Sequence, residues 1–276
     1  MLKKYKPFII FFYVASTLSL IAAAFFDLKL DILLNNTENP IALWFRNTGE
    51  IPGRMVCPLA GAVLFYTSEK TFQKIFALIV NIGGSAYLGY YLGKYFFNNQ
   101  FKMPFSIIFG IGIGICILYA ISFIKIPENI IPIIRKIAFW GIIIMFVQIS
   151  AIEGLKYLWG RVRFRDLLAA GSYEQFTPWY QINGINGNKS FPSGHTAGAG
   201  MSYMMMFFPF LSEKWNKKYP LCFIIPCIYT SIVAFTRLVM GAHYLSDVTA
   251  GGIVSFSIVL IFIYIYEKNL NKKSIS

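Results

Sequence analysis

The sequence predicts an all-α fold, a polytopic bundle of about six to eight transmembrane helices that forms a single integral membrane domain over residues 1–276. Two observations predict it. Hydrophobic residues make up 57% of the chain and charged residues only 13%, whereas a soluble domain carries about 25% charged residues. The apolar residues also gather into runs that approach the roughly 20 residues needed to cross a bilayer.

Seven apolar runs are long enough to indicate spans directly, and one more is shorter. The first, Pro7–Phe26, follows a basic start and is open to interpretation as a signal peptide, but its length favours a retained helix. The shorter run, Met55–Thr67, needs its flanks to cross the membrane. The remaining runs are Ile75–Phe97, Phe105–Ile124, Ile137–Leu155, Thr196–Leu211, Pro220–Thr236 and Val248–Tyr266.

The formal net charge of +13 would suggest nucleic-acid binding in a soluble protein, but in a membrane protein it indicates orientation, and no nucleic-acid partner is expected. If all the runs cross, the basic clusters fall on one face. That face is then cytoplasmic, both termini lie inside, and the acidic loop Asp27–Arg54 lies outside. The clusters are Lys3, Lys4 and Lys6; Lys70 and Lys74; Lys125, Arg135 and Lys136; Lys214, Lys217 and Lys218; and Lys268, Lys272 and Lys273.

One basic segment does not follow this rule and needs another explanation. It lies between the fifth and sixth predicted spans, on the outer face, and contains Lys156, Arg161, Arg163, Arg165 and Lys189. For Arg161 and Arg165, a functional role and interfacial anchoring are equally favoured. In interfacial anchoring, long basic side chains reach the lipid headgroups. Aromatic residues are also expected at this membrane–water interface, namely Trp159, Trp179, Tyr180 and Tyr244.

The only two histidines of the chain lie at the same outer ends of predicted helices. His195 belongs to the stretch FPSGHTA that opens the sixth span, and His243 belongs to GAHYLSD at the start of the eighth. Arg237 ends the seventh span on the same side. Three stretches that are distant in the sequence therefore reach one depth of the membrane.

The residue types at this depth suit the handling of a phosphate group. Lys156, Arg163 and Arg237 supply positive charge, and arginine can hold phosphate oxygens through two parallel hydrogen bonds. Ser193 and the amides of the Ser-Gly-His turn lie at a predicted helix N-terminus, where N–H groups attract an anion.

The histidines suit nucleophilic and acid catalysis at the same place. His243 and Asp247 are four residues apart, so on a helix they would share a face. The carboxylate would then hold one imidazole nitrogen and leave the other to attack, while the second histidine supplies a proton to the leaving oxygen.

Three motifs follow one another along the chain: Lys156-x6-Arg163, Pro192-Ser193-Gly194-His195 and Arg237-x5-His243-x3-Asp247. Their order and spacing resemble the three-part signature of the type 2 phosphatidic acid phosphatase family. The superfamily also contains the vanadium haloperoxidases and glucose-6-phosphatases. The resemblance covers about Lys156–Asp247, within a catalytic core predicted at about residues 137–266, and carries no specific match to residues 1–130.

The resemblance implies a role for each matching residue. His243 is implied as the nucleophile that forms a phosphohistidine, Asp247 as the group that orients it, and His195 as the general acid. No metal and no other cofactor is implied. The residues implied to bind the substrate phosphate are Lys156, Arg163, Ser193, Gly194 and Arg237.

Two residues depart from the family pattern. Phe164 stands where the first motif usually ends in proline. The change removes a backbone restraint on Arg163 and makes Arg161 a candidate to share its role. Thr236 stands where serine usually precedes the arginine of the third motif, and it keeps a hydroxyl group.

The implied function is that of a membrane lipid phosphatase at the outer face of a bacterial inner membrane. Its partners would be membrane lipids and a lipid phosphate substrate, such as phosphatidylglycerol phosphate, phosphatidic acid or a polyprenyl diphosphate. The alternatives are a lipid phosphotransferase with the same intermediate, an enzyme that takes a soluble substrate as glucose-6-phosphatases do, and a catalytically inactive membrane binding protein or transporter. The sequence predicts no oligomeric state.

Overall fold

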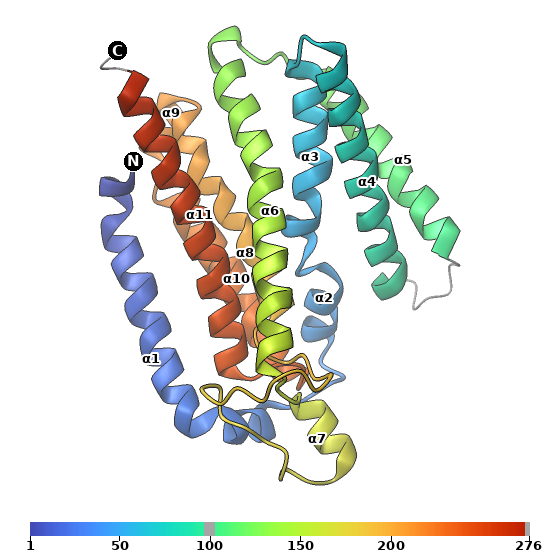
Figure 1. Ribbon diagram of the computed structural model, residues 1–276, viewed down its shortest axis with the longest axis vertical. Coiled ribbons are helices and arrows are strands. Elements are labelled where there is room, and N and C mark those ends of the chain that lie inside the picture. Colours follow the sequence, from blue (N-terminus) through green and yellow to red (C-terminus); the bar gives the residue numbers. More distant parts are fainter. Residues whose placement is uncertain (97–102, 274–276) are drawn as a thin grey trace. The chain divides into compact units, whose positions relative to one another are not determined.

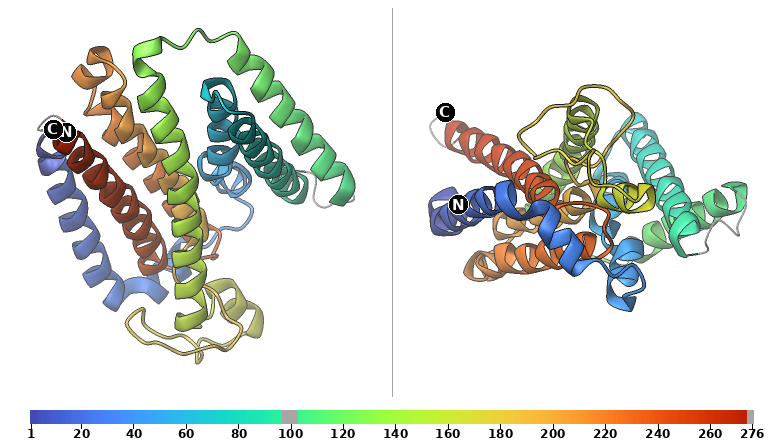
Figure 2. Two further views of the ribbon diagram at one scale, coloured as in Figure 1. Left: turned by 45° about the horizontal axis from the view of Figure 1, so that its top comes forward. Right: turned by 90° about the horizontal axis from the view of Figure 1, so that it is seen from below.

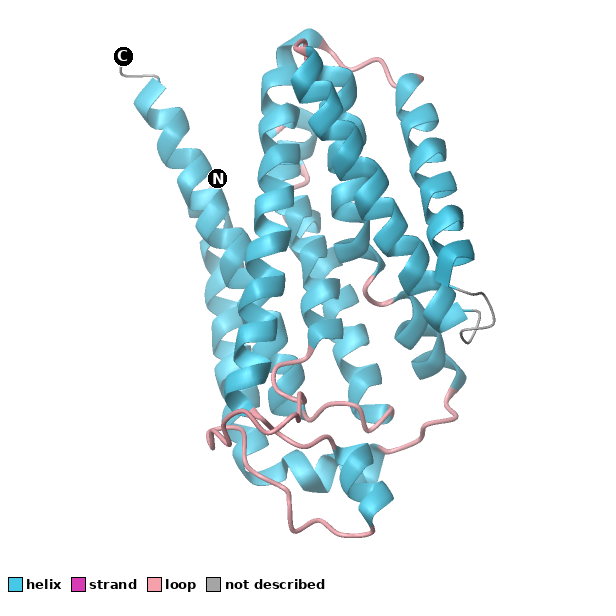
Figure 3. Ribbon diagram, turned by 45° about the vertical axis from the view of Figure 1, so that its right-hand side comes forward, coloured by secondary structure: helices cyan, strands magenta, loops and turns pink. Residues whose placement is uncertain are grey.

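The computed structural model describes residues 1–96 and 103–273, with side chains up to residue 270, so the predicted positions Phe97, Lys272 and Lys273 lie outside the described side chains. Every regular element in this part of the chain is a helix (Figure 3), which confirms the predicted all-α class. Within the described residues, six segments are long and apolar enough to cross a membrane. They are Leu2–Leu34, Thr71–Phe96, Met103–Ser122, Glu128–Ala170, Leu221–Val239 and Leu245–Leu270. The chain is therefore an integral membrane protein.

The helices follow one another along the chain in the order labelled in Figure 1. The α-helices are α1 (Leu2–Leu34), α2 (Pro40–Thr48), α3 (Ile51–Thr67), α4 (Thr71–Phe96), α5 (Met103–Ser122), α6 (Ile131–Trp159), α7 (Phe164–Ala170), α8 (Gly194–Gly200), α9 (Glu213–Lys217), α10 (Leu221–Val239) and α11 (Leu245–Lys273). Two 3-10 helices accompany them, η1 (Glu128–Ile130) and η2 (Met201–Phe210).

The two other predicted spans are also helical, although each is short. The run Met55–Thr67 lies within α3, which has 17 residues, and an α-helix of that length rises only about 26 Å against a hydrocarbon core of about 30 Å. The run Thr196–Leu211 corresponds to α8 continued directly by η2. Because a 3-10 helix rises about 2.0 Å per residue rather than 1.5 Å, this segment reaches about 30 Å.

The chain divides into two compact units. The first contains Met1–Glu50, Val147–Met206 and Tyr219–Ser276, and all the predicted site residues belong to it. The second contains Ile51–Phe146 and Phe207–Lys218.

In the second unit, α3, α4 and α5 pack through small residues. Gly89 of α4 faces Gly110 of α5 so closely that a Cβ on Gly110 would lie 2.1 Å from the carbonyl oxygen of Ser85. A contact of this kind admits no side chain and is typical of membrane helices, which approach each other through small residues. The apolar core beside it contains Cys57, Ala60, Leu64, Ala77, Ala138 and Ile142.

In the first unit, α1 and α11 run antiparallel and side by side (Figures 1 and 2). The backbone N–H of Leu2 donates to Glu267 Oε1 at 3.0 Å, near the end of α11. Farther along, the hydroxyls of Ser19 and Thr249 are 2.9 Å apart. The start of α1 and the end of α11 therefore lie at one end of the unit. That this end is cytoplasmic stays a prediction.

Helix α1 extends farther than its apolar run predicts. It reaches Leu34, so Asp27 and Asp31 belong to its last turns, and the predicted loop Asp27–Arg54 is wrong over this part. Both aspartates are buried. Asp27 pairs there with a buried cation, Arg161, at 2.9 Å, a partner that hydropathy along the sequence does not reveal.

Candidate active site

The first motif, Lys156 to Arg163, begins in the last turn of α6 and continues through a turn at Gly160. Lys156 lies in the last turn of this helix, and Gly160 follows it with φ +53°, a left-handed conformation that favours glycine. A Cβ on Gly160 would also lie 2.0 Å from the carbonyl oxygen of Gly184. The chain therefore turns sharply after α6, and this turn places Arg161 inside the first unit.

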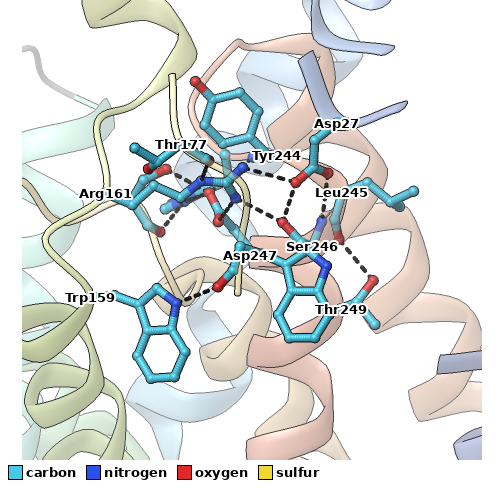
Figure 4. Close-up of polar contacts among 12 residues, drawn as sticks. Asp27, Trp159, Arg161, Thr177, Tyr244, Leu245, Ser246, Asp247 and Thr249 are labelled. Atoms are coloured by element: carbon cyan, nitrogen blue, oxygen red, sulfur yellow. Dashed lines mark hydrogen bonds and ion pairs between the residues drawn. The ribbon is translucent and has the colours of Figure 1, made fainter. Parts of the chain in front are cut away.

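Arg161 is completely buried and joins two carboxylates (Figure 4). Its Nη2 donates to Asp27 Oδ2 at 2.9 Å, and its Nη1 donates to Asp247 Oδ1 at 2.7 Å. Further bonds reach Ser246 Oγ at 2.7 Å and the carbonyl oxygen of Thr177 at 2.8 Å. The guanidinium group thus links α1 to the start of α11, and the backbone N–H of Ser246 adds a direct bond to Asp27 Oδ1 at 3.0 Å.

This position excludes two roles that the sequence left open for Arg161. A side chain without exposed surface is not an interfacial anchor, and its donors are committed to protein oxygens rather than to a substrate phosphate. Tyr244 is also buried, with its ring centroid 4.1 Å from the guanidinium carbon, so its predicted place in the aromatic belt is wrong. Arg165 is exposed and stays compatible with anchoring.

Asp247 lies in the first turn of α11 and connects three segments of the chain. Besides the Arg161 bond, its Oδ2 accepts from Ser190 Oγ at 2.5 Å and from the backbone N–H of Tyr244 at 3.0 Å. The last bond is the reciprocal contact of a capping box. Asp247 therefore caps α11 while its carboxylate faces the histidine before the helix.

His243 lies in the turn before α11, so the predicted shared helix face with Asp247 is wrong. Its Nδ1 is 2.8 Å from the carbonyl oxygen of Ser190 and 3.7 Å from Asp247 Oδ2. Because a carbonyl oxygen only accepts, Nδ1 carries the hydrogen and Nε2 keeps the lone pair that a nucleophile needs. The Asp247 carboxylate therefore lies close to the His243 ring. It also accepts a hydrogen bond from the hydroxyl of Ser190, whose carbonyl oxygen contacts the ring.

Burial lowers the pKa of His243, since water that would stabilise the imidazolium is excluded. The Asp247 carboxylate opposes this effect, whereas the positive charges of Arg163 and Lys156 lower the pKa further. The neutral ring is therefore the form present at neutral pH. Chemistry that needs this neutral ring sets in as the pH rises through the lowered pKa.

His195 lies in the first turn of α8 and contacts a carboxylate that none of the three motifs contains. Its Nδ1 is 3.0 Å from Glu50 Oε1, in the segment between α2 and α3. Burial lowers the pKa of His195 to about 4, Glu50 opposes this change, and the positive charges of Arg237 and His243 add to it. The charges of Glu50, Arg237 and His243 therefore all act on the His195 ring.

Residues of the first and second motifs meet at Gly194. The Nζ of Lys156 lies 3.0 Å from the position that a Cβ on Gly194 would take, so the glycine leaves room for the ammonium group. Lys156 also forms an ion pair with Glu153, three residues earlier on α6. Ser193 caps α8, since its hydroxyl accepts from the N–H of Thr196 at 3.3 Å.

The two arginines predicted to bind phosphate occupy different surroundings. Arg163 is the N-cap residue of α7, and its Nη2 is 3.4 Å from the carbonyl oxygen of Lys189. Arg237 is buried at the end of α10 and donates to the carbonyl oxygen of Ala42 at 3.1 Å. The positive charge of Arg163 lowers the pKa of His243, and that of Arg237 lowers the pKa of His195.

The two departures from the family pattern are accommodated locally. Phe164 is the first residue of α7, a position where proline is favoured. It is 1% exposed and packs with Leu167 and Tyr244, so side-chain packing supplies the restraint on this segment. The hydroxyl of Thr236 donates to the backbone of α10, to the carbonyl oxygen of Val233 at 2.7 Å.

The structure brings the three motifs together at one end of the first unit, but sequence reasoning missed Asp27, Ser190 and Glu50 as site residues. Asp27 carried a usable signal, because it and Asp31 are ionisable residues one helical turn apart at the end of an apolar run. Ser190 and Glu50 had none. Among the described residues, no group of three or more His, Cys, Asp or Glu side chains is arranged to hold a metal ion.

Comparison with known proteins identifies part of the chain. The family model described as the PAP2 superfamily matches residues 137–271, which include all three motifs. No curated protein and no solved structure shows a significant match. The segments that provide Asp27 and Glu50 precede the matched region.

Proposed function

Because the chain belongs to the PAP2 superfamily through residues 137–271, we propose that this membrane phosphatase hydrolyses a lipid phosphomonoester or a lipid pyrophosphate. One observation carries the proposal. The Nδ1–H of His243 is committed to the Ser190 carbonyl at 2.8 Å, so Nε2 has the lone pair for attack on phosphorus. This nitrogen belongs to a ring whose pKa is lowered by burial and by the positive charges of Arg163 and Lys156, the side chains proposed to hold the phosphate.

The reaction proceeds in two balanced steps. In the first, His243 Nε2 bonds to phosphorus, the bond from phosphorus to the leaving oxygen breaks, and His195 gives that oxygen a proton. In the second, His195 takes a proton from water, the water oxygen bonds to phosphorus, and the phosphorus–nitrogen bond breaks. Inorganic phosphate leaves and both histidines return to their starting forms. Positive charge and backbone N–H groups around Ser193 and Gly194 stabilise the phosphate oxygens throughout.

The membrane setting supports a lipid as the substrate. The site lies where α6, α10 and α11 end or begin, next to their apolar membrane-spanning segments. A lipid can keep its tail among such helices while its headgroup reaches the cationic side chains. The proposed site is on the outer face of a bacterial inner membrane, because the basic clusters flank the opposite helix ends.

A phosphate-release assay over a panel of lipid phosphates tests this function. Purified protein in detergent or vesicles should release inorganic phosphate from at least one of phosphatidylglycerol phosphate, phosphatidic acid and a polyprenyl diphosphate. An added alcohol acceptor separates hydrolysis from transfer, since a phosphotransferase would form a new phosphate ester. The variant R165Q, outside the site, serves as the matched control and should behave as the wild type. No phosphate release or transfer from any lipid would contradict the proposal.

Activity is expected to survive a chelator and to fall with vanadate. The physical reason is that Lys156, Arg163 and Arg237 provide the positive charge for the phosphate oxygens, while vanadate mimics five-coordinate phosphorus in the transition state. Steady-state rates with EDTA and with increasing vanadate check this. Loss of activity in EDTA that magnesium restores would contradict a metal-independent mechanism.

The loop between α7 and α8 is expected to face away from the cytoplasm. In a background without native cysteines, single cysteines would replace Ser172, which is exposed, and Lys217, whose side chain is 76% exposed. On intact cells, an impermeant thiol reagent should label position 172 but not position 217, and both should react after lysis. Labelling of position 217 alone on intact cells would reverse the topology.

A further inference from the structure

The two histidines of the site differ in the partner that faces Nδ1. In His243 this partner is a backbone carbonyl, which suits a neutral ring. In His195 it is the carboxylate of Glu50, at 3.0 Å. A carboxylate next to an imidazole favours the charged ring and fixes its orientation. At His195 the Glu50 carboxylate therefore opposes the lowering of the pKa and can orient the ring.

The absence of a side chain at Gly198 of α8 leaves room for Glu50. Gly198 lies one turn after His195, and a Cβ on it would come within 3.1 Å of Glu50 Cγ. The side chains of Glu50 and His195 are only 13% and 17% exposed. The aliphatic part of the Glu50 side chain thus packs against α8 at a position where a larger residue than glycine would crowd it.

The backbone before Glu50 is held by α10. The hydroxyl of Tyr229 lies 3.2 Å from the carbonyl oxygen of Thr48 and 3.3 Å from that of Gly49, and donates to them. Gly49 packs so closely that a Cβ on it would lie 2.9 Å from Val233. The segment that carries Glu50 is thereby positioned before any substrate arrives, as a group that orients a catalytic residue requires.

We propose that Glu50 is a positioning residue that holds the His195 ring in place and keeps a proton available on it for the leaving oxygen. Glu50 contacts Nδ1, so Nε2 is assigned as the donating nitrogen. The inference rests on the proposed function, and it adds a residue from outside the matched family region.

The charges around His195 explain why this carboxylate matters. Arg237 at the end of α10 and His243 before α11 both disfavour a positive ring, as does burial. Glu50 opposes them, and a backbone contact with Arg46 of α2 acts in the same direction as Glu50. Removing the Glu50 charge therefore lowers the pKa of His195. A reaction step that needs the protonated ring is then lost at a lower pH than in the wild type.

The decisive comparison uses E50Q with two substrates that differ in the leaving group. For an alkyl phosphomonoester, kcat should fall about 10- to 100-fold, less than the 10²–10⁴-fold contribution of a general acid because His195 remains. For an aryl ester such as p-nitrophenyl phosphate, whose leaving oxygen needs no proton, the loss should stay within a few-fold. The falling limb of the alkyl-substrate pH profile should move to lower pH. E50D, which keeps the charge, should recover part of kcat.

A second measurement is independent of activity. Because the chain has only two histidines, NMR of histidine-labelled protein gives two titrating rings, which H195A assigns. E50Q should move the titration of His195 to lower pH, whereas E38Q, which changes an exposed acid before α2, should leave both the titration and kcat unchanged. Wild-type protein that releases no phosphate would refute the proposed function, and the titration would still test Glu50. Equal losses with both substrates, or an unmoved His195 titration in E50Q, would overturn this inference.

Discussion

Replacement of His243 by alanine is expected to abolish the phosphoenzyme. The Nε2 of this ring is the proposed nucleophile, and His195, the other histidine, contacts Glu50 and is the proposed proton donor. Rapid quenching with radiolabelled substrate should trap a label in the wild type that is stable in alkali and lost in acid, as expected for a phosphoramidate. The H243A variant should show none of this label.

The matched variant H195A should still form the phosphoenzyme, but slowly. Loss of a general acid costs on the order of 10²–10⁴-fold in rate, and less when the leaving group is a weak base, as in a diphosphate ester. Single-turnover measurements with an alkyl and a diphosphate substrate check both magnitudes. If H243A retained the acid-labile label while H195A lost it, the two roles would be reversed.

The largest loss of stability is expected on replacing Arg161 by glutamine. The change leaves the carboxylates of Asp27 and Asp247 buried without the cation that now bonds to both, at 2.9 and 2.7 Å. Breaking a buried ion pair by removing one partner costs about 3–5 kcal/mol. Denaturant unfolding in detergent should show this decrease in the free energy of unfolding.

The matched control for this prediction is R165Q, four residues away. Arg165 is exposed and lies 3.7 Å from Asp166, itself exposed, so its replacement should leave the unfolding midpoint within error. D27N should cost less than R161Q, because Arg161 keeps its bond to Asp247. Equal midpoints for R161Q and R165Q would show that the buried cation does not hold α1 to α11.

The fold class was predictable because it depends on local features of the sequence, and the residue types of the candidate site could be read in the same way. A bilayer demands long apolar helices, so composition and run length identify the spans without any knowledge of their neighbours. The order and spacing of the motifs around Lys156, His195 and His243 likewise lie within short segments. Which helix ends share one face then follows from the direction in which each span runs.

What only the tertiary structure decided is the partner of each charged or titratable side chain. Asp27 is 134 residues from Arg161, and His243 is 53 residues from the carbonyl that orients its ring. The same holds for Glu50, between α2 and α3, and His195 of α8. Such pairs stabilise buried charge only through contacts made after the helices pack. Hydropathy therefore places Asp27 in a loop, whereas in the folded protein it lies in α1 and bonds to Arg161 and Ser246.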